Sequence, residues 1–186
     1  RQFGISDIIV NVHHFAQQVK DAIEENRGWG SNISTSDESD EVLETGGGLK
    51  KASWYFKQSD HSFVLMNADI LTDLDLNAMM HEHKKQHALA TLAVTERITS
   101  RYLLFNENNL LCGWMNDKTG EIKGQPGTRK AFSGIHIIDP KIFSLISEEG
   151  KFSMIDLYLR ICNDHTIRAY DHSNGLLQDV GKPESI

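Results

Sequence analysis

The sequence has few of the features that mark membrane, disulfide-linked or zinc proteins. It contains only two cysteines, Cys112 and Cys162, which are far apart and form no C-x-x-C pair. Neither a disulfide framework nor a zinc site is therefore indicated. No apolar run approaches the roughly 20 residues that a membrane helix needs, and no signal peptide is visible. We therefore expect a cytoplasmic protein that does not bind a membrane.

Basic residues are also scarce. The 186 residues include 19 lysines and arginines against 26 acidic residues, which gives a formal net charge of −7. This balance argues against general nucleic-acid binding, because such binding needs a basic field to offset phosphate repulsion. A small phosphorylated ligand stays compatible with the charge, because a metal ion and local dipoles can reverse the field within one site.

The sequence lacks a convincing Ser-His-Asp or Cys-His arrangement, so no side-chain nucleophile is indicated. Its histidines include two groups that are close in sequence, but neither group supplies three ligands that could converge on one metal ion. We expect structural roles for these residues, which are His13, His14, His81, His83 and His87.

The stretch 62–75 is the most informative part of the chain. Residues 63–66 are continuously apolar, as in a strand that is buried on both faces of a parallel sheet, and the polar residues Asn67 and Asp69 follow at once. Ligands bind at the carboxyl edge of open α/β sheets, where an acid can hold Mg2+ against substrate phosphates. The alternative is that Asp69 caps a turn or the following helix.

Apolar periodicity predicts alternating strands and helices along the chain, beginning with a parallel β-α-β unit. The predicted strands are 7–12, 32–36, 63–66, 88–95, 102–105, 110–114, 132–138, 167–170 and 175–180. The predicted helices are 15–27, 49–56, 76–87, 139–146 and 153–161, and 118–130 is expected to be a mobile loop.

Glycines mark two further candidate sites. Gly46, Gly47 and Gly48 precede a predicted helix, which indicates a binding loop whose N–H groups point at a flat or anionic ligand; the alternative is a flexible connector. Gly134, within a predicted strand, indicates close approach of a ligand or of another backbone.

Five segments together resemble the sugar-1-phosphate nucleotidyltransferases, in particular the mannose-1-phosphate guanylyltransferase and N-acetylmuramate-1-phosphate uridylyltransferase branch. The resemblance covers essentially the whole chain in order. The segments are Gly4 to His14, Glu44-Thr45-Gly46-Gly47-Gly48, Asn67-Ala68-Asp69, Phe132-Ser133-Gly134-Ile135 and Asp179-Val180-Gly181-Lys182-Pro183-Glu184.

The resemblance implies one catalytic domain over 1–186, with a Rossmann-like α/β fold whose mixed, mostly parallel sheet is flanked by helices. It implies a Mg2+-dependent enzyme that joins a nucleoside triphosphate to a sugar 1-phosphate, with a homo-oligomer as a compatible assembly. The implied roles are catalysis and Mg2+ binding for Asp69 and Asp179, nucleotide binding for Glu44, Thr45, Gly46, Gly47, Gly48 and Asn67, and sugar binding for Ser133 and Gly134.

Three family features differ in this sequence. The glycine-rich G-x-G-T-R-L-x-P loop and the following P-K-P segment are expected upstream of Arg1, so we expect the present chain alone to be inactive. The usual E-K-P before the sugar-pocket strand is not found, which leaves the sugar open. Lys182 stands where threonine is frequent.

Two alternative functions remain open. Asp73-Leu74-Asp75 could be the D-x-D metal motif of a glycosyltransferase, in which case the metal would lie at Asp73 rather than Asp69. The chain could also be a non-catalytic sensor or partner subunit that keeps the fold and binds a nucleotide sugar.

Overall fold

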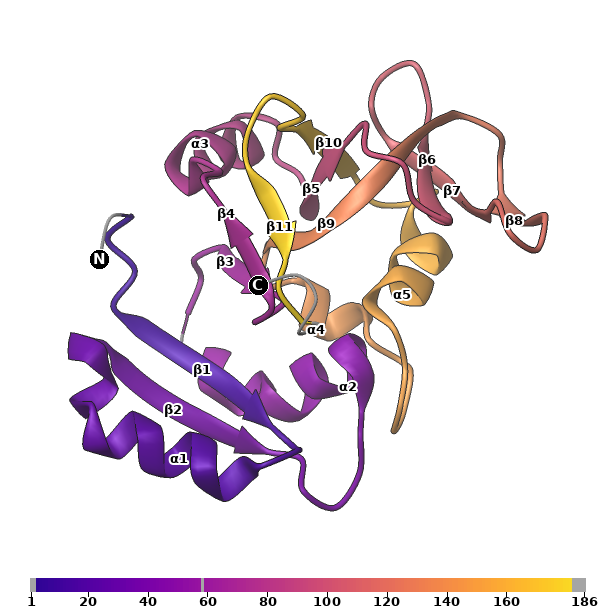
Figure 1. Cartoon of the computed structure of the whole chain (residues 1–186). Coiled ribbons are helices and arrows are strands. Elements are labelled where there is room, and N and C mark those ends of the chain that lie inside the picture. The colour runs from indigo at the N-terminus through magenta and orange to yellow at the C-terminus, as the bar shows by residue number, and fades with distance from the viewer. Residues whose placement is uncertain (1–2, 58, 182–186) are drawn as a thin grey trace. The chain divides into compact units, whose positions relative to one another are not determined.

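The computed structural model describes residues 3–57 and 59–181 (Figure 1). Lys182, Pro183 and Glu184, which belong to the last resembling segment, lie outside the described residues. The chain divides into two compact units, and each is described by itself. Unit 1 comprises Arg1–Ser59 and Phe143–Leu157, and unit 2 comprises Asp60–Ile142 and Tyr158–Ile186. The expectation of a single domain stays a prediction.

Unit 1 begins with the predicted β-α-β arrangement. Its elements are β1 (Asp7–Val12), α1 (Ala16–Glu25), the 3-10 turn η1 (Arg27–Gly30), β2 (Asn32–Asp37), α2 (Glu44–Lys51) and η2 (Ala52–Phe56). The chain returns to unit 1 within α4 (Ile142–Leu145) and leaves it within α5 (Met154–Ile161). The strands β1 and β2 pair in parallel, with Asp7 opposite Asn32, which confirms the prediction.

The helix α1 ends at Glu25, two residues before the predicted end at residue 27. Gly28 has a positive φ of 58° and is packed on the Ile33 side chain, 3.4 Å from where a Cβ would lie. Glycine adopts this left-handed conformation without the steric cost that other residues incur. The turn at Gly28 follows the end of the helix and directs the chain into β2.

Unit 2 contains most of the strands. Its elements are β3 (Phe63–Met66), β4 (Ile70–Thr72), α3 (Leu76–Lys85), β5 (Ala90–Thr95), β6 (Arg101–Phe105), β7 (Leu111–Asn116), β8 (Glu121–Gly124), β9 (Thr128–Ile138), β10 (Ile167–Asp171) and β11 (Leu177–Asp179). One sheet has the order β10-β5-β9-β6-β7-β8, with β3 also paired to β9, and β4 and β11 form a separate ribbon.

The mixed α/β architecture is confirmed, but the expectation of a mostly parallel sheet is wrong for the described residues. Only β1–β2 and β10–β5 are parallel among their strand pairs, while the others run antiparallel. Two of the antiparallel pairs, β6–β7 and β7–β8, have short connections, which exclude parallel pairing because parallel strands need a long crossover. The long strand β9 adds three more, since it runs antiparallel to β3, β5 and β6. The predicted loop 118–130 contains β8 and the start of β9.

The strand β3 also differs from its prediction. It pairs antiparallel with β9 and its residues are half-buried or exposed, whereas every residue of β5 is buried. The buried core of this part of unit 2 contains Met79 of α3, Ala93 of β5, and Ile135 and Ile137 of β9, and the β3 residue Val64 packs against it. An apolar run of four residues does not distinguish these two environments, because it reports hydrophobicity and not the neighbours of the strand.

None of the helices in the described part of the chain is both long enough and apolar enough to cross a membrane.

Candidate active site

Asp69 and Asp179 lie side by side in unit 2, as predicted, although they are far apart in the sequence. The ribbon β4–β11 brings them together, because Asp179 is the register partner of Ile70. The backbone N–H of Val180 then donates to the Asp69 carbonyl at 2.8 Å. Both aspartates are exposed. The antiparallel ribbon thus places two acidic side chains at the same end.

The two carboxylates meet at Gly181. A Cβ on Gly181 would lie 2.6 Å from Asp69 Oδ2 and 3.2 Å from Asp179 Oδ1. Asp179 Oδ1 also accepts a hydrogen bond from the Gly181 N–H at 3.0 Å. A side chain at this position would therefore displace the Asp69 carboxylate, because the carboxylates occupy the space that a Cβ would take.

This donor set fits Mg2+. The ion prefers oxygen ligands and is usually held by one or two carboxylates, with water and substrate phosphates completing its shell. No group of three or more potential metal-ligating His, Cys, Asp or Glu side chains occurs among the described residues. Asp69 and Asp179 therefore suit an ion that is shared with a phosphorylated substrate rather than a closed structural site.

The location of Asp69 differs from the prediction. It does not end a buried parallel strand but lies in the turn between β3 and β4. The turn is fixed at its first residue, because the Asn67 N–H donates to the Gly134 carbonyl at 2.9 Å. A strand, β4, follows Asp69 directly, so this residue does not cap a following helix. Its metal-binding role stays a prediction.

Gly134 approaches another part of the protein closely. It has a φ of 74°, and a Cβ there would lie 3.0 Å from Asn67 Nδ2 and 3.3 Å from Ile70 Cγ1. Ser133 is 1 % exposed, and its Oγ is hydrogen-bonded to His172 Nε2 at 2.8 Å. The Ser133 hydroxyl therefore faces the protein interior, and the sugar-binding roles of Ser133 and Gly134 stay predictions.

The segment Glu44 to Gly48 in unit 1 is not the predicted loop. Glu44 begins α2, and Thr45, Gly46, Gly47 and Gly48 belong to the helix. The N–H groups of Gly46 and Gly47 donate to the Phe152 carbonyl at 3.0 and 3.2 Å. The N–H groups in the first turn of a helix have no partner within the helix. The Phe152 carbonyl supplies that partner here, so these two amides already have a hydrogen bond within the protein.

Close packing explains two of these glycines. A Cβ on Gly46 would overlap the Phe152 ring, and one on Gly47 would overlap the Gly150 carbonyl oxygen. Both glycines are buried. Their small size is thus required by neighbours in the same unit, and the nucleotide-binding role of the Glu44 to Gly48 segment stays a prediction.

The third glycine packs on a polar pair in which Glu38 is buried and Asn11 is exposed. Gly48 lies against Asn11 Nδ2 and Glu38 Oε1, which are hydrogen-bonded to each other at 2.5 Å. Glu38 is 6 % exposed, and its carbonyl is bonded to His13 Nδ1 at 2.6 Å. Sequence reasoning did not identify Asn11 and Glu38, because no motif links two residues that only the β1–β2 pairing brings together.

The predicted structural role of His83 is confirmed, because its ring is buried and bonded to Thr91 and Ser62 at 2.9 and 3.1 Å. Asp75 accepts from two N–H groups as the N-cap of α3. Asp73 accepts from the backbone N–H of Leu176 at 2.6 Å.

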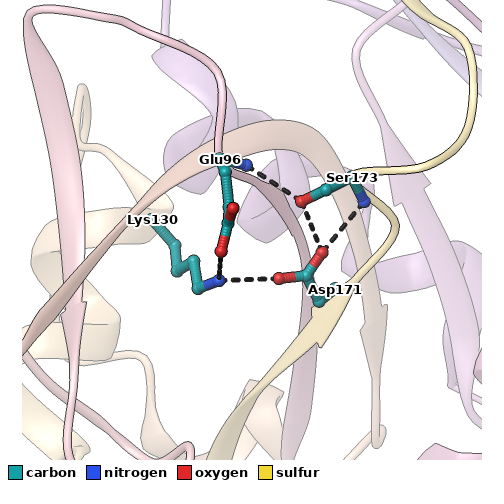
Figure 2. Close-up of polar contacts among 4 residues, drawn as sticks. All are labelled: Glu96, Lys130, Asp171 and Ser173. Atoms are coloured by element: carbon teal, nitrogen blue, oxygen red, sulfur yellow. Dashed lines mark hydrogen bonds and ion pairs between the residues drawn. The ribbon is translucent and has the colours of Figure 1, made fainter.

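A second polar cluster in unit 2 was missed from the sequence. Figure 2 shows Lys130 between Glu96 and Asp171, with N–O distances of 2.8 and 2.7 Å, and Ser173 beside Asp171. An open groove of about 370 Å³ lies next to this cluster. It is lined by Asp73, Leu74, Asp75, Tyr170, Asp171, His172, Ser173, Asn174 and Gly175.

Comparison with known proteins identifies the family. The sequence matches the family described as "Nucleotidyl transferase" over residues 1–186. This chain belongs to the nucleotidyl transferase family. The resemblance of the five sequence segments is thereby confirmed, and the acidic pair lies in a nucleotidyl transferase domain.

Relatives of this nucleotidyl transferase chain carry informative names. It is 27% identical over 188 residues to N-acetylmuramate alpha-1-phosphate uridylyltransferase from Neisseria meningitidis, covering 97% of this chain and 75% of the relative. It is 24% identical over 189 residues to mannose-1-phosphate guanyltransferase 2 from Candida glabrata, covering 98% and 50%. Against two of the curated relatives that it matches, the chain spans only 42% and 50% of the length of the relative.

Solved structures show the same fold. A putative glucose-1-phosphate thymidylyltransferase from Bacillus anthracis, in complex with a sucrose, superimposes with a TM-score of 0.78. The alignment covers 99% of this chain and 74% of that chain at 16% sequence identity. The α/β fold of the family is therefore shown.

Proposed function

We propose that this chain provides the metal- and sugar-phosphate-binding part of a sugar-1-phosphate nucleotidyltransferase. The reaction joins a nucleoside triphosphate and a sugar 1-phosphate into a nucleotide sugar and releases pyrophosphate. A sugar-phosphate oxygen forms the new bond to the α-phosphorus, and the bond from that phosphorus to the leaving pyrophosphate breaks. The names of the relatives support this reaction class.

The observation that carries the proposal is the meeting of Asp69 and Asp179 at Gly181. Nucleotidyl transfer asks a protein mainly for positioning and charge neutralisation and needs no side-chain nucleophile. Asp69 and Asp179 would hold Mg2+, which when bound would neutralise charge on the substrate phosphates. The ribbon β4–β11 keeps both carboxylates at one end, so the protein fixes the position of that charge.

The contacts of the neighbouring acids favour this pair over the D-x-D alternative. Asp75 is occupied as a helix N-cap, and Asp73 binds the Leu176 N–H. Asp179 also accepts one backbone N–H, that of Gly181. The preference therefore rests on Asp75, whose two N-cap hydrogen bonds make it less available to a metal, and on the convergence of Asp69 and Asp179 at Gly181. The cytoplasmic location and an assembly of identical copies stay predictions from the sequence.

The first test is pyrophosphate release from the full-length protein, with Mg2+ and four nucleoside triphosphates each crossed with several sugar 1-phosphates. We expect Asp69→Asn and Asp179→Asn to lower any release by about 100-fold or more, because each removes a fixed charge at the reacting phosphates. Asp164→Asn is the matched control, since Asp164 is an exposed acid in a turn of the same unit.

The second test does not depend on activity. Mn2+ binding, followed by electron paramagnetic resonance, should weaken in Asp69→Asn and Asp179→Asn and remain unchanged in Asp164→Asn. Equal Mn2+ affinity in all four proteins would contradict the metal assignment. Mn2+ binding at the pair, without pyrophosphate release by the full-length protein from any substrate combination, would favour the sensor alternative.

A further inference from the structure

His172 connects the end of β10 to β9, a strand that is not its neighbour in the sheet. Its backbone N–H donates to the Val94 carbonyl of β5 at 3.0 Å, which extends the β10–β5 pairing by one residue. Its ring Nε2 is bonded to Ser133 Oγ of β9 at 2.8 Å. Because β5 lies between β10 and β9, the ring reaches past a whole strand to make this contact.

The preceding residue makes a parallel connection. Asp171 forms an ion pair with Lys130 of β9 at 2.7 Å, and Lys130 also contacts Glu96 at 2.8 Å (Figure 2). Two consecutive residues at the end of β10 thus hold β9 at two nearby positions, Lys130 and Ser133. This end of β10 is therefore fixed against the part of β9 where its pairing becomes irregular.

That irregularity is a bulge. Leu92 of β5 is opposite His136, but Val94 is opposite Phe132, so three residues of β9 face the single Ala93. Such extra residues bend a strand and re-aim its backbone groups. Gly134 is the middle residue, and its carbonyl accepts the Asn67 N–H at 2.9 Å.

The polar ring of His172 is not explained by stability. It is 9 % exposed, and its Nδ1 is buried without a hydrogen-bond partner among the described residues. Burial lowers the pKa of His172, while the Asp171 and Asp73 carboxylates act in the opposite direction. A buried polar atom without a partner costs stability that an apolar ring would not cost, so a role other than packing is indicated.

We propose that His172 is a positioning residue for the metal-binding turn. Through Ser133 it holds the bulge on β9, and through the Gly134 carbonyl the bulge holds Asn67, the residue two positions before Asp69. This inference rests on the proposed function only in the last step, from the turn to catalysis. The earlier steps concern the backbone and can be measured in the absence of substrate.

The test uses a short and a long amide at one position. His172→Gln can place a polar atom near the position of Nε2 and keep the bond to Ser133, whereas His172→Asn is too short to reach it. We expect faster hydrogen exchange of the Asn67 amide in His172→Asn, and exchange close to that of the parent in His172→Gln. Amide exchange followed by nuclear magnetic resonance measures this directly.

The functional readout is the split between kcat and KM. We expect His172→Asn to lower kcat for pyrophosphate release by about tenfold or more, as for residues that orient metal ligands, with a smaller change in the KM for the nucleotide. His172→Gln should recover most of the loss. The same ranking is expected for Mn2+ affinity.

A double variant separates positioning from folding. His172→Phe with Ser133→Ala replaces both bonded polar groups by apolar ones, so we expect a free energy of unfolding at least equal to that of the parent. Its kcat should nevertheless be as low as that of His172→Asn. Parent-like kcat in this stable double variant would overturn the proposal.

The two proposals fail in different ways. Unchanged exchange of the Asn67 amide in His172→Asn would overturn the positioning role whether or not the chain is active. Faster exchange in that variant, with no Mn2+ binding at Asp69 in any protein, would support the structural link and overturn the proposed function instead.

Discussion

The buried ring of His136 should make this protein sensitive to mild acid. His136 lies on β9, 1 % exposed, with Nδ1 bonded to the Tyr158 hydroxyl at 3.0 Å. Burial lowers its pKa from 6.5 to about 3. The folded protein therefore keeps this ring neutral at pH values where the unfolded chain has already bound a proton.

The sign and size of the effect follow from linkage. Because the pKa of His136 is lower in the folded state, stability is lost as the pH falls below the unfolded value of 6.5, and the loss continues to about pH 3. One pKa unit corresponds to about 1.4 kcal/mol. Between pH 7 and pH 5 the protein should thus lose about 2 kcal/mol through this one residue.

The assay is urea unfolding at pH 7 and pH 5 for the parent and for His136→Gln. The glutamine does not titrate, so the difference in stability between parent and variant should change by about 2 kcal/mol over this range. A constant offset from altered packing or from the Tyr158 bond does not affect this change. His81→Gln is the matched control for removal of a histidine, since His81 is exposed.

The reasoning would be refuted by parallel stability curves for the parent and His136→Gln. Such a result would mean that the folded protein takes up the proton as readily as the unfolded chain. The ring would then be reached by water in solution, in contrast to its buried position on β9.

Two glycine substitutions test close contacts within the protein, one inside each unit. Gly47→Ala should destabilise the protein by about 1 to 3 kcal/mol, because the new methyl group overlaps the Gly150 carbonyl oxygen; an unchanged urea midpoint would argue against this packing and leave Gly47 free for a ligand. Gly181→Ala should weaken Mn2+ binding with little effect on the urea midpoint, because its methyl group displaces the exposed Asp69 carboxylate. Unchanged Mn2+ affinity in Gly181→Ala would count against a metal held at this point.

The sequence determined the order and type of most elements. Alternating apolar runs predicted β1 at residues 7–12 with the observed bounds, because β-branched residues favour strands whatever lies around them. The family resemblance of five segments also predicted that Asp69 and Asp179 act as a pair, and the antiparallel ribbon β4–β11 brings them together. Local chemistry was sufficient for these points, since each depends on residues that are close in sequence or on a recognisable motif.

Only the tertiary structure decided what each element faces. The glycines at positions 46–48 indicate a close approach in the sequence, but the approaching groups are Phe152, Gly150 and the Asn11–Glu38 pair. A glycine in a sequence indicates that another group comes close, but it does not indicate which group. A ligand-binding loop and a tightly packed helix can therefore have the same run of glycines. The bulge on β9 and its tie to His172 likewise depend on the pairing of β5 between β9 and β10, and strand order is set by long-range contacts that no local pattern records.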